Sequence, residues 1–421
     1  MEERLGHGLR RTRIALGPLN KNLSFLPSML IPSGIAQILL PKSDLNVLDL
    51  SHFSIPSPPK TDSPALLHSY PDAELFSNLA SMVGEGHVAF LQSLPMPSSK
   101  EVETLEVRLD KYSSAVIDSE KNNPIRSILY CHNSLNIRLP LWVLEYWKAA
   151  NEVHKEKIHW DRAIEWLKRK KHHDAIGLLS QLPWTYQLPR TMGYRVSDLV
   201  PLCSERWLGG EHVDSMLEVL KDNLESKGPG IHVSIQGIQF MWKLIEIYRY
   251  SRDKYAEAQN CNFVRDFADK LKMAKVSVFG TAVAVQIGGD DVLLPKGEEI
   301  RANHWCAVVI NTDRLTIQYG DPMGKAPPSE LLDVIRWWLG LSFSMTFSLH
   351  NLPVTLQKDS FSCAILAYNA LSHHFIPTIP LLQNGEPCIL GRIDAFVGII
   401  KLLKKLVSGL NPTSIFENKL T

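Results

Sequence analysis

The stretch QKDSFSCAILAYNAL, residues 357–371, lies a short way after NHWCAVVINTDRLTIQYGDPMG, residues 303–324. Together the two stretches contain a thiol, an imidazole, a carboxylate and a side-chain amide. Acyl transfer to a cysteine needs these groups, because the thiol requires a base, the base requires an orienting partner, and the developing oxyanion requires hydrogen-bond donors. The pattern therefore predicts a cysteine-nucleophile site in this part of the chain.

The first stretch has the pattern of a β-hairpin. The apolar, β-branched runs WCAVVI and LTIQYG flank the polar segment NTDR, residues 311–314, which predicts a turn centred between Thr312 and Asp313. In that register His304 faces Asp321, at roughly 4.5–5.5 Å between Cβ atoms, and the carboxylate can accept the imidazole Nδ1–H. A bulge that shifted the register by one residue would send the two side chains to opposite faces.

The second stretch predicts a helix that begins at Cys363. The segment CAILAYNALSHHF has helical apolar spacing and no proline, and Asp359, Ser360 and Ser362 before it are candidate N-caps. A thiol in the first turn lies at the positive end of the helix dipole, which favours a thiolate. Gln357, six residues earlier, can direct its amide at an oxyanion, together with the backbone N–H of Cys363.

These residues resemble those of a known family. The chain resembles the Ulp/SENP-type ubiquitin-like-protein-specific cysteine proteases in four features: a His-Trp pair, a second strand that ends in YGDPMG, a Gln and a Cys six residues apart, and the segment RWLGGEHVDSMLEVL. That segment, residues 206–220, is similar to the family's W-L-N-D-x-x-I-N opening. The resemblance spans roughly residues 200 to 410 and implies an α+β, papain-like domain with the triad in the order His, Asp, Cys. It implies that His304 is the base, Asp321 its orienter, Gln357 the oxyanion-hole amide and Cys363 the nucleophile.

The resemblance also implies how a substrate binds. Trp207 and Trp305 correspond to tryptophans that cover a tunnel for a modifier's Gly-Gly tail, where larger residues would collide with the indoles. Two positions depart from the family pattern: Ser362-Cys363-Ala364 stands in place of Asp-Cys-Gly, and Gly209-Gly210 in place of Asn-Asp. The second departure removes polar groups that would touch the modifier.

The expected function is that of a cysteine peptidase which cleaves after the Gly-Gly of a ubiquitin-like modifier, with a SUMO-type modifier favoured, to deconjugate it or mature its precursor. One alternative is a catalytically weak or dead protease fold that only binds the modifier, which Ala364 favours slightly. Another is a nucleic-acid-associated protein, such as one encoded by a mobile element, with an accessory protease domain. The formal net charge of +1 disfavours nucleic acid as a partner.

Composition agrees with an intracellular protein. The six cysteines show no C-x-x-C pair, which argues against a zinc site and a disulfide framework and favours a reducing compartment, the nucleus or cytoplasm. No cofactor or metal is expected. No apolar run approaches the roughly 20 residues of a membrane span, so no membrane partner is expected either.

The organisation along the chain predicts three parts. Residues 1–65, with the segment SIPSPPKTDSP, read as a disordered linker. Residues 66–185 read as a mostly helical domain for substrate recruitment or docking, with a long helix after Pro140, and residues 190–415 as the protease domain. One face of the long helix carries residues that recur at helical spacing: Leu144, Trp147, Asn151, His154 and Ile158. The basic run KRKKHH, residues 168–173, reads as a solvated helix end.

Overall fold

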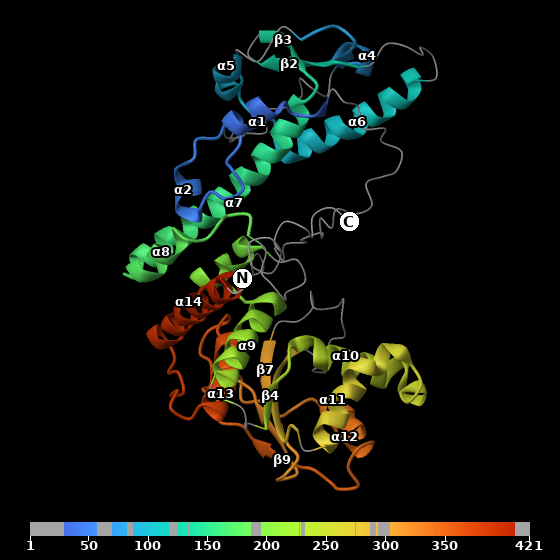
Figure 1. Cartoon of the computed structure of the whole chain (residues 1–421), viewed down its shortest axis with the longest axis vertical. Coiled ribbons are helices and arrows are strands. Elements are labelled where there is room, and N and C mark those ends of the chain that lie inside the picture. Colours follow the sequence, from blue (N-terminus) through green and yellow to red (C-terminus); the bar gives the residue numbers. More distant parts are fainter. Residues whose placement is uncertain are drawn as a thin grey trace, which may run out of the picture. The chain divides into compact units, whose positions relative to one another are not determined.

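The computed structural model describes residues 29–56, 70–81, 87–117, 125–132, 135–186, 195–226, 228, 232–273, 275–286, 292–293 and 304–408. The chain divides into two compact units (Figure 1). Unit 1 consists of Met1–Arg162 and Leu179–Thr185, and unit 2 of Ala163–Leu178 and Tyr186–Thr421.

Unit 1 combines helices with a small antiparallel sheet. Its strands, in the order β1-β2-β3, are β1 (Phe76–Ser77), β2 (Ser127–His132) and β3 (Leu135–Pro140). Its helices are α1 (Ser33–Leu39), α2 (Val47–His52), α4 (Asp72–Leu75), α5 (Val88–Ser93) and α6 (Ser99–Ile117), while α7 (Val143–Arg169) and α8 (His173–Leu179) each contribute residues to both units. Leu144, Trp147 and Asn151 on the predicted face of α7 are buried.

One prediction for this half needs correction. Residues 1–65 are not all linker, because α1 and α2 are ordered helices and Ile35 and Leu39 are buried in the apolar core of unit 1. The rest of this segment, residues 1–28 and 57–65, lies outside the described residues. Beside its helices the domain contains a small sheet, in which β2 and β3 pair from Ser127 with Pro140 to His132 with Leu135. Pro140 therefore ends a strand, and the long helix begins three residues later.

Unit 2 contains a mixed sheet in the order β4-β5-β7-β8-β9, with β6 also paired to β5. The strands are β4 (Val233–Ile235), β5 (Val278–Gln286), β6 (Val292–Leu293), β7 (His304–Asn311), β8 (Thr316–Gly320) and β9 (Ser348–Asn351). β7 is antiparallel to both of its neighbours, whereas β4–β5 and β8–β9 are parallel. The α+β class predicted for this part of the chain is confirmed.

The helices of unit 2 cover both faces of the sheet (Figure 1). They are α9 (Gly210–Glu225), α10 (Ile238–Tyr250), α11 (Asn262–Lys272), α12 (Ser329–Gly340), α13 (Cys363–Phe375) and α14 (Glu386–Ser408), with short 3₁₀ helices η3 (Val196–Cys203), η4 (Arg252–Lys254) and η5 (Gln259–Cys261). Helices α10, α11 and α12 form one apolar core with the sheet, in which the ring of Phe240 meets Phe267 at 5.3 Å and Trp338 at 5.4 Å edge to face.

The opposite face of the sheet is lined by small residues where α13 packs. Gly280, Ala282 and Ala284 alternate along β5. A Cβ on Gly280 would lie 2.5 Å from Cε2 of Phe375 and 3.1 Å from Cδ2 of Leu371, both on α13. Glycine therefore allows this close packing, because a side chain here would force Phe375 or Leu371 to shift.

Within the part of the chain that the structure describes, no helix is long and apolar enough to cross a membrane.

Asp214 on α9 caps the start of α10 from a distance, and its Oδ1 accepts the N–H of Ile238 at 2.8 Å. Burial raises the pKa of Asp214 to about 6, against the opposing effect of that hydrogen bond. The folded state therefore binds the proton more tightly than the unfolded state does. The contribution of Asp214 to the free energy of unfolding is therefore complete below pH about 4 and decreases as the pH rises from about 4 to 6.

We expect Asp214→Asn to keep the cap, because an amide oxygen also accepts a hydrogen bond, and to remove the buried charge. At pH 7.5 the variant should be more stable than the wild type by about 1–3 kcal/mol, and near pH 4 the two should converge. Urea unfolding across this pH range measures the difference. The exposed Asp333→Asn is the matched control, and a difference for Asp214→Asn that does not change with pH would contradict the assignment.

Candidate active site

His304 and Asp321 form a buried pair at one end of the β7–β8 hairpin. His304 is the first residue of β7, Asp321 follows the last residue of β8, and Nε2 of the imidazole lies 2.6 Å from Oδ1 of the carboxylate. The side chains are 1% and 3% exposed. The structure thus brings the two predicted residues together, but through Nε2 and not through the Nδ1 that the sequence argument expected.

The register of the hairpin differs from the predicted one by two residues. Val308 pairs with Tyr319, where the expected turn would have placed it opposite Ile317. The loop lies one residue further along than expected, and Leu315 takes a left-handed conformation with φ 54°. A two-residue shift keeps every side chain on its original face. His304 and Asp321 therefore still share a face and meet diagonally.

A tight turn after β8 fixes the carboxylate. Oδ1 of Asp321 also accepts the N–H of Met323 at 2.6 Å, and its carbonyl accepts the N–H of Gly324 at 2.8 Å. Gly324 has φ 72°, in the left-handed region that glycine adopts without steric cost. The backbone of this turn thus orients the Asp321 carboxylate independently of its contact with the imidazole.

Cys363 is the first residue of α13 and is almost completely buried. The loop before it is ordered by Asp359, whose Oδ1 accepts the N–H groups of Phe361 and Ser362 at 2.9 and 2.8 Å. Oδ2 of Asp359 accepts the hydroxyl of Ser362 at 2.7 Å. Of the three predicted caps, Asp359 therefore holds the entry to the helix, and Ser362 makes no side-chain cap of its own.

His304 contacts the thiol of Cys363 as well as Asp321. Burial disfavours charge on the imidazole, but hydrogen bonds with Asp321, Cys306 and Cys363 outweigh it and raise the pKa of His304 to about 11. The ring is therefore protonated at neutral pH, with a carboxylate on one nitrogen. An imidazolium held beside a thiol can donate its proton to a leaving group.

Gln357 lies between the nucleophile loop and the segment after Asp321. Its backbone N–H donates to the carbonyl of Pro322 at 2.7 Å, and its side-chain Nε2 donates to the carbonyl of Asp359 at 3.0 Å. An amide nitrogen carries two N–H groups, so one remains for a further acceptor. The position agrees with the expected oxyanion-hole amide, and that role stays a prediction.

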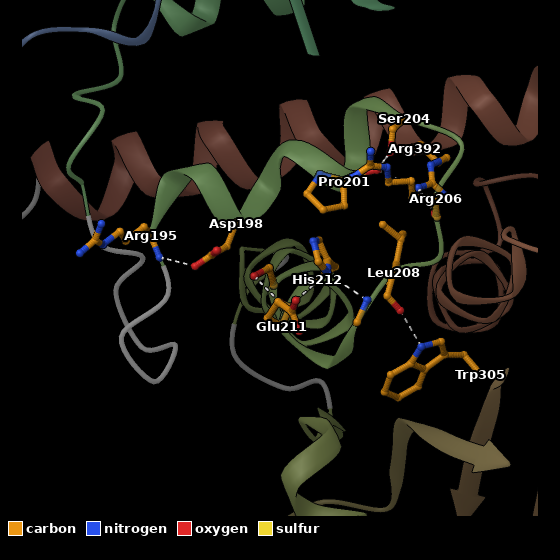
Figure 2. A network of polar contacts seen from close by, with 12 residues as sticks. Arg195, Asp198, Pro201, Ser204, Arg206, Leu208, Glu211, His212, Trp305 and Arg392 are labelled. Atoms are coloured by element: carbon orange, nitrogen blue, oxygen red, sulfur yellow. Dashed lines mark hydrogen bonds and ion pairs between the residues drawn. The ribbon is translucent and has the colours of Figure 1, made fainter. Parts of the chain in front are cut away.

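Trp207 and Trp305 stack on each other. Their ring centroids are 6.0 Å apart and their planes lie 21° from parallel. A peptide needs about 3.5–4 Å to the ring on either side, so nothing passes between the indoles in this arrangement. Trp305 is buried and its Nε1–H donates to the carbonyl of Leu208 at 2.8 Å (Figure 2). Trp207 is half-buried.

A residue that sequence reasoning missed connects the two sides of the site. Arg392 extends from α14 toward η3 and the segment that follows it (Figure 2), where its guanidinium donates to the carbonyls of Pro201 in η3 at 2.9 Å and of Arg206 at 2.6 Å. It also donates to the carbonyl of Phe361 at 3.3 Å. One side chain thus holds the residue before Trp207 and the loop before Cys363.

Arg392 keeps its positive charge although it is buried. Burial lowers the pKa of the guanidinium to about 10, and neighbouring groups that include Asp359 partly counteract this. The side chain is therefore a cation at neutral pH although it is fully buried. The signal for it in the sequence was a single arginine within the apolar run CILGRIDAFVGII, residues 388–400.

The Gly209-Gly210 pair is explained by packing at the start of α9. A Cβ on Gly210 would lie 2.6 Å from Cδ1 of Ile238 on α10. The N–H of Gly209 donates to Nδ1 of the buried His212 at 3.0 Å, which caps the helix (Figure 2). A side chain at Gly210 would thus press on α10, whereas a Cβ at Gly209 would lie 2.5 Å from Oε2 of Glu211 on α9 itself.

No family model and no curated protein matches the chain. Among solved structures, it is similar to the yeast Ulp1 protease domain in complex with Smt3, the ortholog of SUMO, at 17% identity over 55% of this chain and 96% of that one, with a TM-score of 0.39. It is also similar to the Ulp1-like SUMO protease catalytic domain of Chaetomium thermophilum, at 13% identity over 57% of this chain and 88% of that one, with a TM-score of 0.38. A third similar structure is the Xanthomonas campestris effector XopD bound to ubiquitin, at 16% identity over 46% of this chain and 91% of that one, with a TM-score of 0.29.

We expect Arg392→Gln to lower the free energy of unfolding by about 3 kcal/mol, because the shorter amide cannot reach three carbonyls and leaves buried acceptors without donors. Urea denaturation measures this loss. The control is Arg336→Gln on the exposed face of α12, which should stay within about 0.5 kcal/mol of the wild type. Equal stability of the two variants would show that Arg392 does not hold the loops together.

Proposed function

We propose that this protein is a cysteine peptidase that cleaves after the carboxy-terminal Gly-Gly of a ubiquitin-like modifier. The observation that carries the proposal is the position of Cys363 at the start of α13, in contact with an imidazole whose Nε2 is held by Asp321. That combination supplies a nucleophile, a proton carrier and an orienting carboxylate in one buried cluster.

The acylation step uses these groups in sequence. The thiolate of Cys363 attacks the carbonyl of the terminal glycine, and the oxyanion takes hydrogen bonds from the backbone N–H of Cys363 and the side-chain amide of Gln357. When the tetrahedral intermediate collapses, the protonated His304 gives its proton to the departing amine. A thioester between Cys363 and the modifier remains.

The hydrolysis step reverses the role of the imidazole. His304 is now neutral and takes a proton from the water that attacks the thioester. The C–S bond then breaks, which restores the Cys363 thiolate beside the protonated His304, and the carboxylic acid of the modifier leaves as a carboxylate after releasing its proton to solvent. Asp321 keeps the ring in one orientation through both steps, since the charge on the imidazole appears and disappears next to it.

Selectivity for Gly-Gly follows from the stacked indoles. A residue with a Cβ needs a wider gap between Trp207 and Trp305 than glycine does, and the gap has to be opened from a closed stack. By sequence resemblance a SUMO-type modifier is favoured over ubiquitin. Gly209-Gly210 weakens that preference, because the polar pair expected there is replaced by residues without side chains.

A second candidate is a module that binds the modifier without cleaving it. It is favoured by the burial of Cys363, which is 1% exposed. The two candidates differ in whether the thiol becomes reachable when the modifier binds. A nucleic-acid-associated protein with an accessory protease domain remains the third hypothesis from the sequence.

The probe that tests the proposal is a SUMO-type modifier with an electrophile in place of the bond after Gly-Gly. We expect the full chain to form a covalent adduct at Cys363, detected by mass spectrometry, and a matched probe that ends in Ala-Ala to fail because its methyl groups collide with the indoles. Cys363→Ser is the control for attachment elsewhere. Binding of the probe without an adduct would support the binding module, and retention of nucleic acid at moderate salt without binding would support the third hypothesis.

Asp321→Asn tests the orienting role. The substitution preserves the shape of the side chain but removes the charge that faces the imidazole, and we expect kcat on a Gly-Gly substrate to fall by about 10⁴-fold without unfolding. Circular dichroism and steady-state kinetics measure the two effects. A nearly silent substitution would mean that the contact at 2.6 Å is structural and that another group orients His304.

A further inference from the structure

A third side chain joins the pair formed by His304 and Asp321. Among the described residues, His304, Cys306 and Asp321 form a group in which one ligand atom from each lies within 4.8 Å of the others, and all three are buried. The thiol of Cys306 hydrogen-bonds to the imidazole. In the acyl-transfer mechanism this thiol has no part, so its position needs a separate explanation.

The hairpin brings the three residues together by its register. His304 and Cys306 are two apart on β7 and point to the same face of the sheet. The observed register pairs Ala307 with Gly320, and one further step places Asp321 opposite Cys306. Two neighbouring strands therefore present an imidazole, a thiol and a carboxylate on a rigid surface, and no loop movement is needed to collect them.

Outer hydrogen bonds already orient two of the three groups. The hydroxyl of Tyr319 on β8 donates to Sγ of Cys306 at 3.0 Å, and the N–H of Met323 donates to Oδ1 of Asp321 at 2.6 Å. These two hydrogen bonds hold the sulfur and the carboxylate at fixed positions beside the imidazole. Metal sites are built in this way, with the ligand side chains fixed by a second layer of contacts.

We propose that His304, Cys306 and Asp321 bind a zinc ion. The donor atoms are Nε2 of the imidazole, Sγ of the thiolate and a carboxylate oxygen, and the protons that leave Nε2 and the thiol pass to solvent. A set of one sulfur, one nitrogen and one oxygen suits Zn²⁺ and does not suit Mg²⁺ or Ca²⁺, which prefer oxygen alone. A water molecule completes the tetrahedral coordination.

Zinc at this position would switch the site off, a consequence that rests on the proposed function. Nε2 is the atom that Asp321 holds, so an ion bound to it separates the imidazole from its orienting carboxylate. A metal-bound imidazole also carries no proton on that nitrogen and loses the positive charge that the mechanism requires. We therefore expect zinc to inhibit peptidase activity reversibly, with activity restored by a chelator.

The binding test uses the full chain and does not depend on activity. Equilibrium dialysis with Zn²⁺ should give one tight site per chain, and substitution by Co²⁺ should produce a sulfur-to-cobalt charge-transfer band in the near ultraviolet. Cys306→Ser should weaken zinc binding by more than about 100-fold and abolish the band, and Tyr319→Phe should weaken binding by about 10–100-fold. Cys261→Ser, a buried cysteine elsewhere in the same core, is the matched control and should bind as the wild type does.

Cys363→Ser separates the proposed site from a site made by the nucleophile. Retention of zinc and of the charge-transfer band in this variant supports the proposal. Loss of both in Cys363→Ser with retention in Cys306→Ser would overturn it, as would the absence of a tight site in the wild type. Inhibition is measured as the ratio of peptidase activity with and without zinc for each variant. A wild type that has no activity even without zinc would contradict the proposed function. Equilibrium dialysis would still decide whether the metal site exists.

Discussion

The close approach of α13 to the sheet places Cys363 beside His304. Gly280, Ala282 and Ala284 leave a shallow face on β5, and Phe375 and Leu371 of α13 pack so close to it that a Cβ on Gly280 would lie 2.5 Å from Cε2 of Phe375. Because Cys363 is the first residue of that helix, its distance from His304 depends on how deeply the helix sits. A side chain on Gly280 would require Phe375 or Leu371, near the end of α13 opposite Cys363, to shift. The packing of α13 thus depends on small residues along one face of β5.

The site concentrates buried polar groups, and the charged ones among them have partners that compensate for their burial. His304 and Asp321 satisfy each other, Asp359 accepts the N–H groups of the nucleophile loop, and Arg392 distributes its donors among three carbonyls. Buried charges of this kind contribute less to stability than apolar packing of the same volume, and removing one partner costs several times more than the pair contributes. Their effect is to fix loop positions. In this protein the loops that are fixed carry Trp207 and Cys363.

The proposed substrate path and the proposed zinc site use different faces of β7. One face bears Trp305, which stacks on Trp207, whereas the other bears His304 and Cys306. Alternation along a strand places these two functions on opposite sides of one backbone. Opening of the tryptophan pair and binding of an ion at Nε2 can therefore occur independently, and each changes whether the imidazole and the thiol can react.

The sequence by itself determined which groups are present and which local elements carry them. The apolar runs around NTDR predict a hairpin, the segment from Cys363 predicts a helix, and the order of His304, Asp321, Gln357 and Cys363 indicates the chemistry, because strand and helix periodicity are local properties. Only the tertiary structure decided the register of the hairpin and which nitrogen of His304, Nε2, contacts the Asp321 carboxylate. It alone also showed that Cys306 lies beside these two residues. The role of Arg392, which contacts residues about 30 and 190 positions away, was also invisible in the sequence, because such contacts arise only when distant segments pack together. Helices α1 and α2 could not be predicted either, because the proline-rich sequence around them is typical of a linker. The burial of Ile35 and Leu39 in an apolar core is visible only in the tertiary structure.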